Sequence, residues 1–329
     1  MGAVVAEAGA PACRRLAIAA LLLAGALLGC RSAVETARPL PAWDLERTEI
    51  VRWRADDPAF DQDKAIEASG LAVAGGRLFV ASEKYARLLV MNAASDPEAR
   101  VVQLALPPHA ELEGVAVSGR EILLCDEAHA AVYQVALAAV SEAAARPTER
   151  RLPVRELKLR GVSVRGGKLG FEGIEVDPLR GDVLLLLERS HVEGDACVSI
   201  LFRLRRLDDS LGLRGRPIEI ELEDCAWRLT GLAWWGSSLM ALKSQFPGER
   251  YEVVLVDQLT GETTVVLDLT ETLRSLRLQG WGNNVEGIAF ADDGALWLVS
   301  DNAVTGVIDD PQPSRAEELT LLVRIPPAD

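Results

Sequence analysis

Five oxygen-bearing side chains occupy the same place in a short motif that recurs along the chain. Each stands directly before a glycine that opens an apolar run, as Glu286 does in Val285-Glu286-Gly287-Ile288-Ala289. The five residues are Ser69, Glu113, Glu172, Thr230 and Glu286. Carboxylate and hydroxyl oxygens are the ligands that Ca²⁺ prefers, and the set holds no Cys or His that would favour Zn²⁺. The series therefore predicts one Ca²⁺ bound by all five residues, provided that the fold brings them together.

A charge argument supports a cation at this place. Two carboxylates about 6 Å apart repel by roughly 3 kcal/mol at an effective dielectric of 20, so three of them cost about 8 kcal/mol. That cost is comparable to the stability of a whole domain. Protonation is one way to offset it and a cation is another. The alternative to a metal is the ammonium group of Lys243, but one lysine cannot balance three carboxylates.

A second set of polar residues lies mainly where the next apolar run of each repeat ends. The candidates for a general base are Asp126, Glu188 and Asp301. Substrate contacts are expected from Glu83, His129, Arg189, Lys243, Asn284 and Asn302. Of these, Arg189 and Lys243 would hold an anionic group in an otherwise acidic mouth. The plainer interpretation, that loop residues are polar because they are solvated, explains Glu83 and Arg189 but not the five residues before the glycines.

The repeat itself predicts the elements that position these residues. The motif glycines lie at positions 70, 114, 173, 231 and 287, at intervals of 44, 59, 58 and 56 residues. Within each repeat, apolar runs alternate with turn signals such as Asp293-Gly294, which indicates hairpins. A repeat of this length with several short strands is typical of β-propeller blades.

Four strands are expected in each complete repeat. In the first they lie near 68–73, 77–82, 86–91 and 101–106, and in the third near 171–176, 183–188, 199–204 and 217–222. A turn is expected around 208–214, and a short helix within 137–150. The continuous run Val183–Leu187 is typical of a strand covered on both faces.

The fifth repeat is one strand short, and the chain has a spare strand near its start. Pairing Ile50–Trp53 with Leu319–Ile325 would close the ring and cover its exposed edges. The sequence therefore predicts an all-β fold, a five-bladed β-propeller whose ring is closed by the N-terminal strand. Six blades, with one copy unrecognised, is the alternative.

The first 30 residues read as an export signal. Arg14-Arg15 precedes the apolar run Leu16–Leu28, which is too short to span a bilayer comfortably. The run ends in Leu27-Leu28-Gly29-Cys30, which resembles the lipobox of bacterial lipoproteins and implies lipidation at Cys30. An ordinary secretory signal or a short buried helix is the alternative. The expected organisation is a signal peptide over 1–29, a lipid-anchored linker over 30–43 and a single propeller over 44–329. The lipobox implies a cell-envelope location, and Arg31 favours the outer membrane, facing the periplasm.

Charge and missing motifs narrow the class of partner. The net charge is −14, and no basic block stands out, so nucleic acid is an unsuitable partner. The sequence has no Gly-x-Ser-x-Gly elbow and no phosphate-binding Gly-Lys-Ser/Thr loop. The expected partners are a small anionic or ester substrate, or another envelope protein. The expected state is a monomer that meets the membrane only through its N-terminal lipid.

Three cysteines remain after the export signal. Cys197 and Cys225 are placed symmetrically about residue 211, the centre of the predicted turn. If they face each other across that hairpin, their Cβ atoms come within reach of a disulfide. Cys125 ends an inner apolar run and is expected to be a small buried hydrophobic residue.

The motifs support two family resemblances. Asn284-Val-Glu-Gly-Ile-Ala-Phe290, followed by Leu296-Trp-Leu-Val-Ser-Asp-Asn302, resembles the bacterial phytase-like (esterase-like) β-propeller family. The series of five residues before the glycines resembles the axial ring of calcium-activated apyrases, which are five-bladed propellers. This chain has Ser82-Glu83-Lys84 where those enzymes carry an Asp-Asp-Arg element, which argues against nucleotide hydrolysis.

Three functions follow as hypotheses. The first is a Ca²⁺-dependent hydrolase of a phosphate or ester substrate, in which the metal polarises an oxygen or activates water. The second is a non-catalytic binding or scaffold propeller in which the ion ties the blades together. The third is a lactonase-type enzyme.

Overall fold

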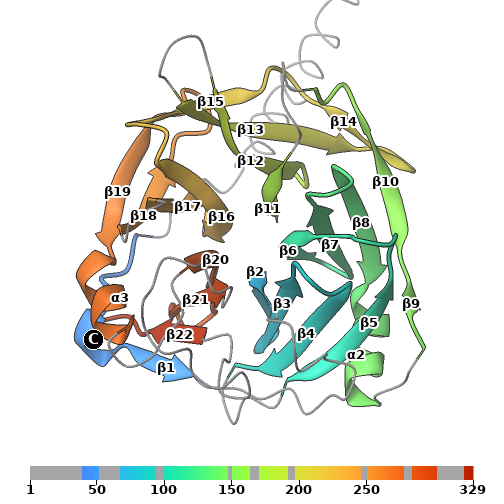
Figure 1. The fold of residues 1–329 in the computed structure, drawn as a ribbon, viewed down its shortest axis with the longest axis horizontal. Helices are drawn as coiled ribbons and strands as arrows, with labels where there is room; N and C mark the ends of the chain where they lie inside the picture. Colours follow the sequence, from blue (N-terminus) through green and yellow to red (C-terminus); the bar gives the residue numbers. More distant parts are fainter. Residues whose placement is uncertain are drawn as a thin grey trace, which may run out of the picture. The chain divides into compact units, whose positions relative to one another are not determined.

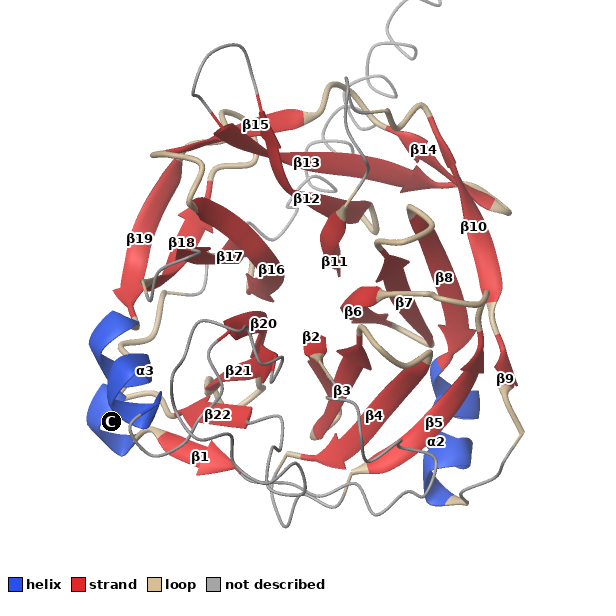
Figure 2. Ribbon diagram, in the orientation of Figure 1, coloured by secondary structure: helices blue, strands red, loops and turns tan. Residues whose placement is uncertain are grey.

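Antiparallel strands account for nearly all of the regular structure, with two short α-helices at the periphery (Figure 1 and Figure 2). The computed structural model describes residues 39–51, 67–93, 99–146, 150–163, 170–191, 197–245, 250–277, 284–301 and 322–328. All of them belong to the unit Pro39–Asp329. The predicted signal peptide and Cys30 lie outside them. No helix among the described residues has the length and apolarity needed to span a membrane.

The described strands form five antiparallel groups that run outward from the centre of the molecule (Figure 1). The first contains β2 (Ala68–Ala74), β3 (Arg77–Ser82), β4 (Arg87–Asn92) and β5 (Arg100–Ala105). The second contains β6 (Leu112–Ser118), β7 (Glu121–Asp126), β8 (Ala131–Ala136) and β10 (Arg155–Arg160). The third contains β11 (Phe171–Val176), β12 (Val183–His191), β13 (Cys197–Arg206), β14 (Ser210–Leu213) and β15 (Ile218–Leu222).

The remaining strands complete the set. The fourth group contains β16 (Trp227–Trp235), β17 (Ser238–Gln245), β18 (Tyr251–Val256) and β19 (Thr263–Asp268). The fifth contains β20 (Asn284–Phe290), β21 (Leu296–Asp301), β22 (Leu322–Ile325) and β1 (Glu49–Val51). Outside these groups lie the 3-10 helix η1 (Leu45–Arg47), α2 (Leu137–Ala145), β9 (Leu152–Pro153) and α3 (Thr270–Arg277). The arrangement is that of a β-propeller.

Glycines at tight turns allow the inner hairpins to form. Gly75 and Gly76, between β2 and β3, have φ of 56° and 71°, and strand pairing resumes with Ala74 opposite Arg77. Two consecutive positive φ values are the requirement of a type I′ turn, which few other residues meet. The predicted Asp293-Gly294 turn also forms, with φ of 90° at Gly294.

The chain closes on itself as expected. β1 pairs antiparallel with β22, with Ile50 opposite Val323. Just before β1, Trp43 bridges to Pro327 and its indole N–H donates to the carbonyl of Gly294 at 3.2 Å. The predicted pairing of the N-terminal strand with the last strand is therefore confirmed.

Two features of the periphery differ from the expectations. Residues 210–213, predicted to lie in a turn, form β14, which pairs with β13 and also parallel with β10. This pairing joins the second and third groups into one nine-stranded sheet. The helix α3 was also not predicted. Its first residue, Thr270, donates its backbone N–H to Asp268, and Leu273 and Leu276 are buried against the core.

The interior consists of apolar clusters between neighbouring groups of strands. The run Val183–Leu187 in β12 is buried on both faces, as predicted, with every residue at most 2% exposed. Its odd-numbered residues pack into one cluster, and Leu184 and Leu186 pack into another. Each such side chain contributes about 1.5–3 kcal/mol when it is buried, so the sandwiching of sheets holds the ring together.

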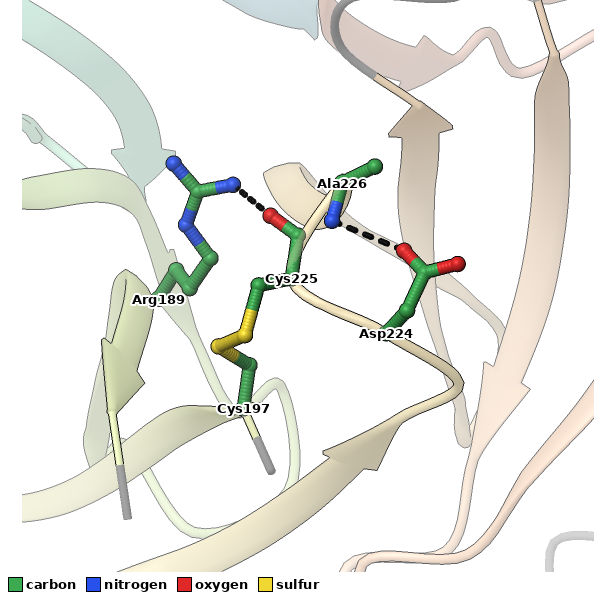
Figure 3. The surroundings of a disulfide bond; sticks show 5 residues. All are labelled: Arg189, Cys197, Asp224, Cys225 and Ala226. Carbon is green, nitrogen blue, oxygen red and sulfur yellow. Dashed lines mark hydrogen bonds between the residues drawn. A yellow bond between two sulfur atoms is a disulfide. The ribbon is translucent and has the colours of Figure 1, made fainter. Parts of the chain in front are cut away.

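A disulfide joins Cys197 to Cys225, with the Cα atoms 5.2 Å apart (Figure 3). The predicted register is wrong in detail, because Cys197 stands opposite Leu222 in the β13–β15 pair. Cys225 lies beyond the end of β15, so the bond ties a strand to the loop that enters β16. The side chain of Arg189 donates to the carbonyl of Cys225 and fixes the same loop (Figure 3).

Candidate functional site

The five innermost strands surround the axis, and each carries its motif residue at an irregularity of pairing. β2, β6, β11, β16 and β20 contact one another in sequence order, and β20 contacts β2 again. In each, the register with the next strand shifts at the residue before the glycine, for example between Val285 and Gly287. Glu113, Glu172, Thr230 and Glu286 are each the one residue skipped, and at the first repeat Ser69 and Gly70 are skipped together. A bulge leaves its extra residue unpaired and re-aims its side chain, here in the same way five times.

The glycine that follows is required by close packing between neighbouring inner strands. A Cβ atom on Gly231 would lie 2.7 Å from the carbonyl oxygen of Glu286. A Cβ on Gly287 would lie 2.7 Å from the carbonyl oxygen of Ser69. Gly70 and Gly114 meet the backbone of the next inner strand in the same manner. The motif therefore has two parts, a residue that faces the axis and a glycine that lets the strands approach.

The motif residues form a buried acidic cluster. Glu113 is 4% exposed and Glu286 is 7% exposed. Burial, reinforced by the charges of Glu172 and Glu286, raises the pKa of Glu113 well above its usual range. Burial and the charge of Glu188 do the same to the pKa of Glu172. For Glu286, burial raises the pKa to about 8, although Arg228 opposes the shift.

Four of the motif residues line one small cavity at the axis. Ser69, Glu113, Glu172 and Thr230 contribute to its wall, while Glu286 contributes only through its neighbours Gly287 and Ile288. The hydroxyl oxygens of Ser69 and Thr230 are buried, and neither has a hydrogen-bond partner of normal geometry among the described residues. The cavity volume is about 10 Å³, which is room for one water or one ion and not for an organic molecule.

Glu286 is turned away because Arg228 holds it. The guanidinium of Arg228 lies 3.3 Å from Glu286 and 2.9 Å from Glu188. It also donates to Asn284 at 2.5 Å, and Asn284 donates to Glu286 at 2.6 Å. Arg228, not Lys243, is thus the protein's own cation at the acidic cluster.

Arg228 was missed at the sequence level, although a signal existed. Side chains alternate along a strand, so the residue two before each motif residue shares its face. Those positions are Glu67, Glu111, Gly170, Arg228 and Asn284. Two of the five, Arg228 and Asn284, contact Glu286. Counting by twos from Thr230 would have placed Arg228 at the mouth of the channel.

Glu67 is the second residue that the sequence reading missed. Its carboxylate lies 2.6 Å from the Nζ of Lys84. Burial raises the pKa of Glu67 to about 7, with Lys84 opposing the shift and Glu83 and Asp301 reinforcing it. The predicted substrate contact Glu83 also pairs with Lys84, so this corner of the mouth is an acid–base network.

The predicted general bases occupy different surroundings. Asp126 is fully buried and accepts from the backbone N–H groups of Glu111 and His129 and from the hydroxyl of Tyr133. The Nδ1 of His129 also lies 2.8 Å from this carboxylate. Asp126 therefore organises a loop, with His129 as its partly exposed partner. Glu188 is bound to Arg228, and Asp301 lies at the end of β21 opposite Asn284.

The two cations predicted to hold an anionic substrate are engaged elsewhere. Lys243 is 3% exposed and lies 2.5 Å from Glu223 and 3.3 Å from Glu252, above the ring of Trp227. Arg189 donates to the carbonyl of Cys225. A buried lysine keeps its charge when acidic and aromatic groups surround it, which explains why Lys243 does not turn to the axis. Asn302 lies outside the described residues.

No three His, Cys, Asp or Glu side chains within the described ranges are arranged to hold a metal ion. This follows from the geometry above, since two of the motif residues are hydroxyls and Glu286 is drawn to Arg228. The donors that remain, two carboxylates and two buried hydroxyls, are all oxygen atoms. They fit a hard cation such as Ca²⁺ in chemistry.

Comparison with known families gives one match. Residues 105–303, more than half of the chain, match the family Phytase-like, which is described as "Esterase-like activity of phytase". The matched part contains four of the five motif residues. No curated protein is similar to the chain at a significant level.

Several solved structures share the general arrangement at low identity. One titled "Structure of RS223-Beta-xylosidase" has a TM-score of 0.48 at 11% identity and covers 80% of this chain and 92% of its own. The major allergen Mala s 1 of Malassezia sympodialis has a TM-score of 0.46 at 9% identity and covers 84% and 95%. A luciferin-regenerating enzyme has a TM-score of 0.44 at 9% identity and covers 85% and 95%.

Proposed function

The chain belongs to the Phytase-like family, described by its esterase-like activity, and from that premise we propose that it is a Ca²⁺-dependent hydrolase of a phosphate or ester substrate. The observation that carries the proposal is the half-paired acidic cluster at the axis. Glu286 has Arg228 as a partner, while among the described residues neither Glu113 nor Glu172 forms an ion pair. Two buried carboxylates that lack a counter-charge favour the uptake of a cation.

Ca²⁺ would be held by Glu113 and Glu172 together with the hydroxyls of Ser69 and Thr230, and Glu286 would be shared with Arg228. A Ca²⁺ ion in this place supplies Lewis-acid chemistry, the polarisation of a phosphoryl or ester oxygen. The raised pKa values of Glu113 and Glu172 support this assignment, because a bound cation removes the repulsion that contributes to them.

The residues of the mouth have separate roles in the proposal. Glu188 is committed to Arg228, which reduces its readiness to accept a proton, so Asp301 is the general base. Arg228 orients Glu188 and supplies positive charge near the reacting group. Asn284, His129 and Glu83 offer hydrogen-bonding groups to the substrate from neighbouring strands.

A substrate panel tests the proposal. The panel contains phytate, nucleotides, aryl phosphates, aryl esters and lactones, each with Ca²⁺ and with EDTA. We expect hydrolysis of one class that is lost with EDTA and lost in Asp301→Asn. A thermal melt of the wild type and of Glu172→Gln provides the binding readout, with Ca²⁺ raising Tm of the wild type only. If chelation leaves Tm unchanged and elemental analysis finds no calcium, the axial site is wrong.

A non-catalytic scaffold is the second candidate, and the size of the axial cavity favours it. A volume of about 10 Å³ admits an ion but no substrate, so in this case the ion only ties the inner strands together. A protein that gains stability from Ca²⁺ but turns over nothing in the panel supports the scaffold. Turnover of lactones alone supports a lactonase-type enzyme instead.

We further propose that the five groups of strands are five blades of one propeller, and that the protein is a monomer anchored by lipid at Cys30 to the cell envelope, at the outer membrane facing the periplasm. Acyl chains contribute about 0.8 kcal/mol per buried CH₂, so several of them anchor a protein without a spanning helix. A Cys30→Ser protein should leave the membrane fraction. Retention of that variant with membranes would contradict the anchor.

A further inference from the structure

A larger cavity lies away from the axis, between the first and second groups of strands. Its volume is about 350 Å³, within the range of pockets that hold small organic molecules. The walls come from the connection between β3 and β4, from β5 and the segment that follows it, and from the residue before β9. The lining residues that matter here are Lys84, Tyr85, Arg87, Leu104, His109 and Arg151.

The charge of these walls is opposite to that of the chain. The protein has 49 acidic against 35 basic residues, yet none of the residues that line this cavity is acidic. Lys84 is already neutralised by Glu67 at 2.6 Å and by Glu83. Arg87 and Arg151 therefore give the cavity its positive charge, and the imidazole of His109 adds a further hydrogen-bonding group.

The remaining wall is apolar and flat. The guanidinium of Arg87 stacks over the ring of Tyr85 at 4.9 Å, which orients its N–H groups in one plane. Leu104 is 1% exposed and Pro107 and Pro108 lie beside it in the wall. An anion that entered would meet a forked donor at one side and an apolar surface at the other.

The backbone at the rim is strained. His109 has a φ of 61°, in the left-handed region that residues other than glycine seldom adopt. Such strain costs on the order of 1–3 kcal/mol and concentrates where ligands are clamped. The strained residue in this structure lines the one cavity of ligand size found among the described residues.

We propose that this cavity binds a small organic anion, a carboxylate or phosphate monoester with an aromatic or other apolar body. The anionic group pairs with Arg87 and Arg151, and the body packs on Tyr85 and Leu104. The inference does not depend on whether the axial cluster binds Ca²⁺ or catalyses a reaction.

Calorimetric titration of the full-length protein in detergent tests the proposal, with EDTA present so that the axial site plays no part. The probes are 2-naphthoate and 2-naphthyl phosphate, with the neutral isostere 2-naphthamide and inorganic phosphate as controls. We expect at least one naphthyl anion to bind and both controls to bind at least tenfold more weakly. Arg151→Gln should weaken anion binding about tenfold, the loss of one charge-assisted hydrogen bond.

The matched control is Lys158→Gln, an exposed cation on β10 that does not line the cavity. It removes the same charge and should leave binding unchanged. Arg87→Gln should reduce binding further, and if it does not fold, Arg151→Gln still decides the question. Absence of binding by either naphthyl anion, equal binding of 2-naphthamide, equal binding of inorganic phosphate, or an equal loss in Lys158→Gln would each overturn the proposal.

Discussion

Arg228 decides how the acidic cluster divides. It satisfies Glu188 and Glu286 and leaves the other carboxylates and two hydroxyls around the axial cavity. A fixed guanidinium in such a cluster acts as a permanent counter-ion, because arginine keeps its charge at any physiological pH. The affinity of the cavity for a cation is therefore set by a balance between this residue and the acids.

Replacing Arg228 shifts that balance. In Arg228→Gln, Glu286 becomes available and one positive charge leaves, so we expect Ca²⁺ to bind about tenfold more tightly. The metal-free protein should lose about 2–4 kcal/mol, since two buried carboxylates lose their partner. Titration calorimetry and urea unfolding measure the two effects. Arg274→Gln, on the exposed face of α3, is the control, and unchanged Ca²⁺ affinity in Arg228→Gln would contradict the division described here.

Glu175 provides a pH-dependent test away from the motif residues. Burial raises the pKa of Glu175 to about 8, opposed by the backbone N–H of Val176. The folded state therefore binds a proton more tightly than the unfolded state, so this stability is present below a pH of about 4.5 and is lost as the pH rises through about 8.

In Glu175→Gln this dependence should be absent. We expect the variant to gain about 1–2 kcal/mol over the wild type at pH 9 and to lose that advantage at pH 5. Urea unfolding at several pH values, all with EDTA, measures the difference. Parallel pH curves for the two proteins would show that Glu175 does not titrate as described.

At this scale, the sequence predicted which residues lie together better than what they do. The position before each glycine sufficed to assemble Ser69 and the three glutamates. It could not show that Glu286 turns to Arg228, because that choice depends on side chains from a neighbouring strand. Nor could it show that Lys243 has Glu223 and Glu252 as partners, contacts that depend on how the loop after β15 is placed.

At the scale of elements, the bulge and the glycine form one device. The bulge directs a side chain to the axis, and the glycine lets the next inner strand pass within contact distance. Gly231→Ala should destabilise the protein by about 2–4 kcal/mol, because its Cβ would lie 2.7 Å from the carbonyl of Glu286 and backbone atoms must move. Gly119→Ala is the control, at a turn where an added Cβ meets nothing within 4 Å, and its cost should stay near 1 kcal/mol, the strain of its positive φ. Equal losses would show that close approach at Gly231 is not limiting.

Strand positions were predictable to within a few residues because apolar runs and turn signals mark them. Partners at the periphery were not. The strand β14 has Gly212 at its centre and only four residues, and its pairing with β10 joins segments from different repeats. The register of β15 was missed for a related reason, since β14 takes up residues that the prediction had placed in the turn.

At the scale of the whole molecule, the seam between β1 and β22 completes the ring. Ile50→Asp should weaken it by at least 2 kcal/mol, since Ile50 packs against the core cluster of the fourth and fifth groups and stands opposite Val323. Hydrogen exchange of the β22 amides and the melting temperature report the change. Val265→Asp, on the outermost strand β19 where the side chain is 50% exposed, is the control. Similar losses in both variants would argue that the seam has no special weight.

The same seam also governs when the molecule can finish folding. Glu49 and Arg324, which meet across it, are 275 residues apart, so a chain delivered from one end must hold its first strand in waiting until nearly everything else has arrived. Long-range pairing of this kind is slow, and during the delay the edge of β21 is open to neighbours. A second copy that presents its own residues 49–51 in that interval offers the same pairing. The rate of synthesis, and not only the sequence, thus sets how much strand-exchanged dimer forms.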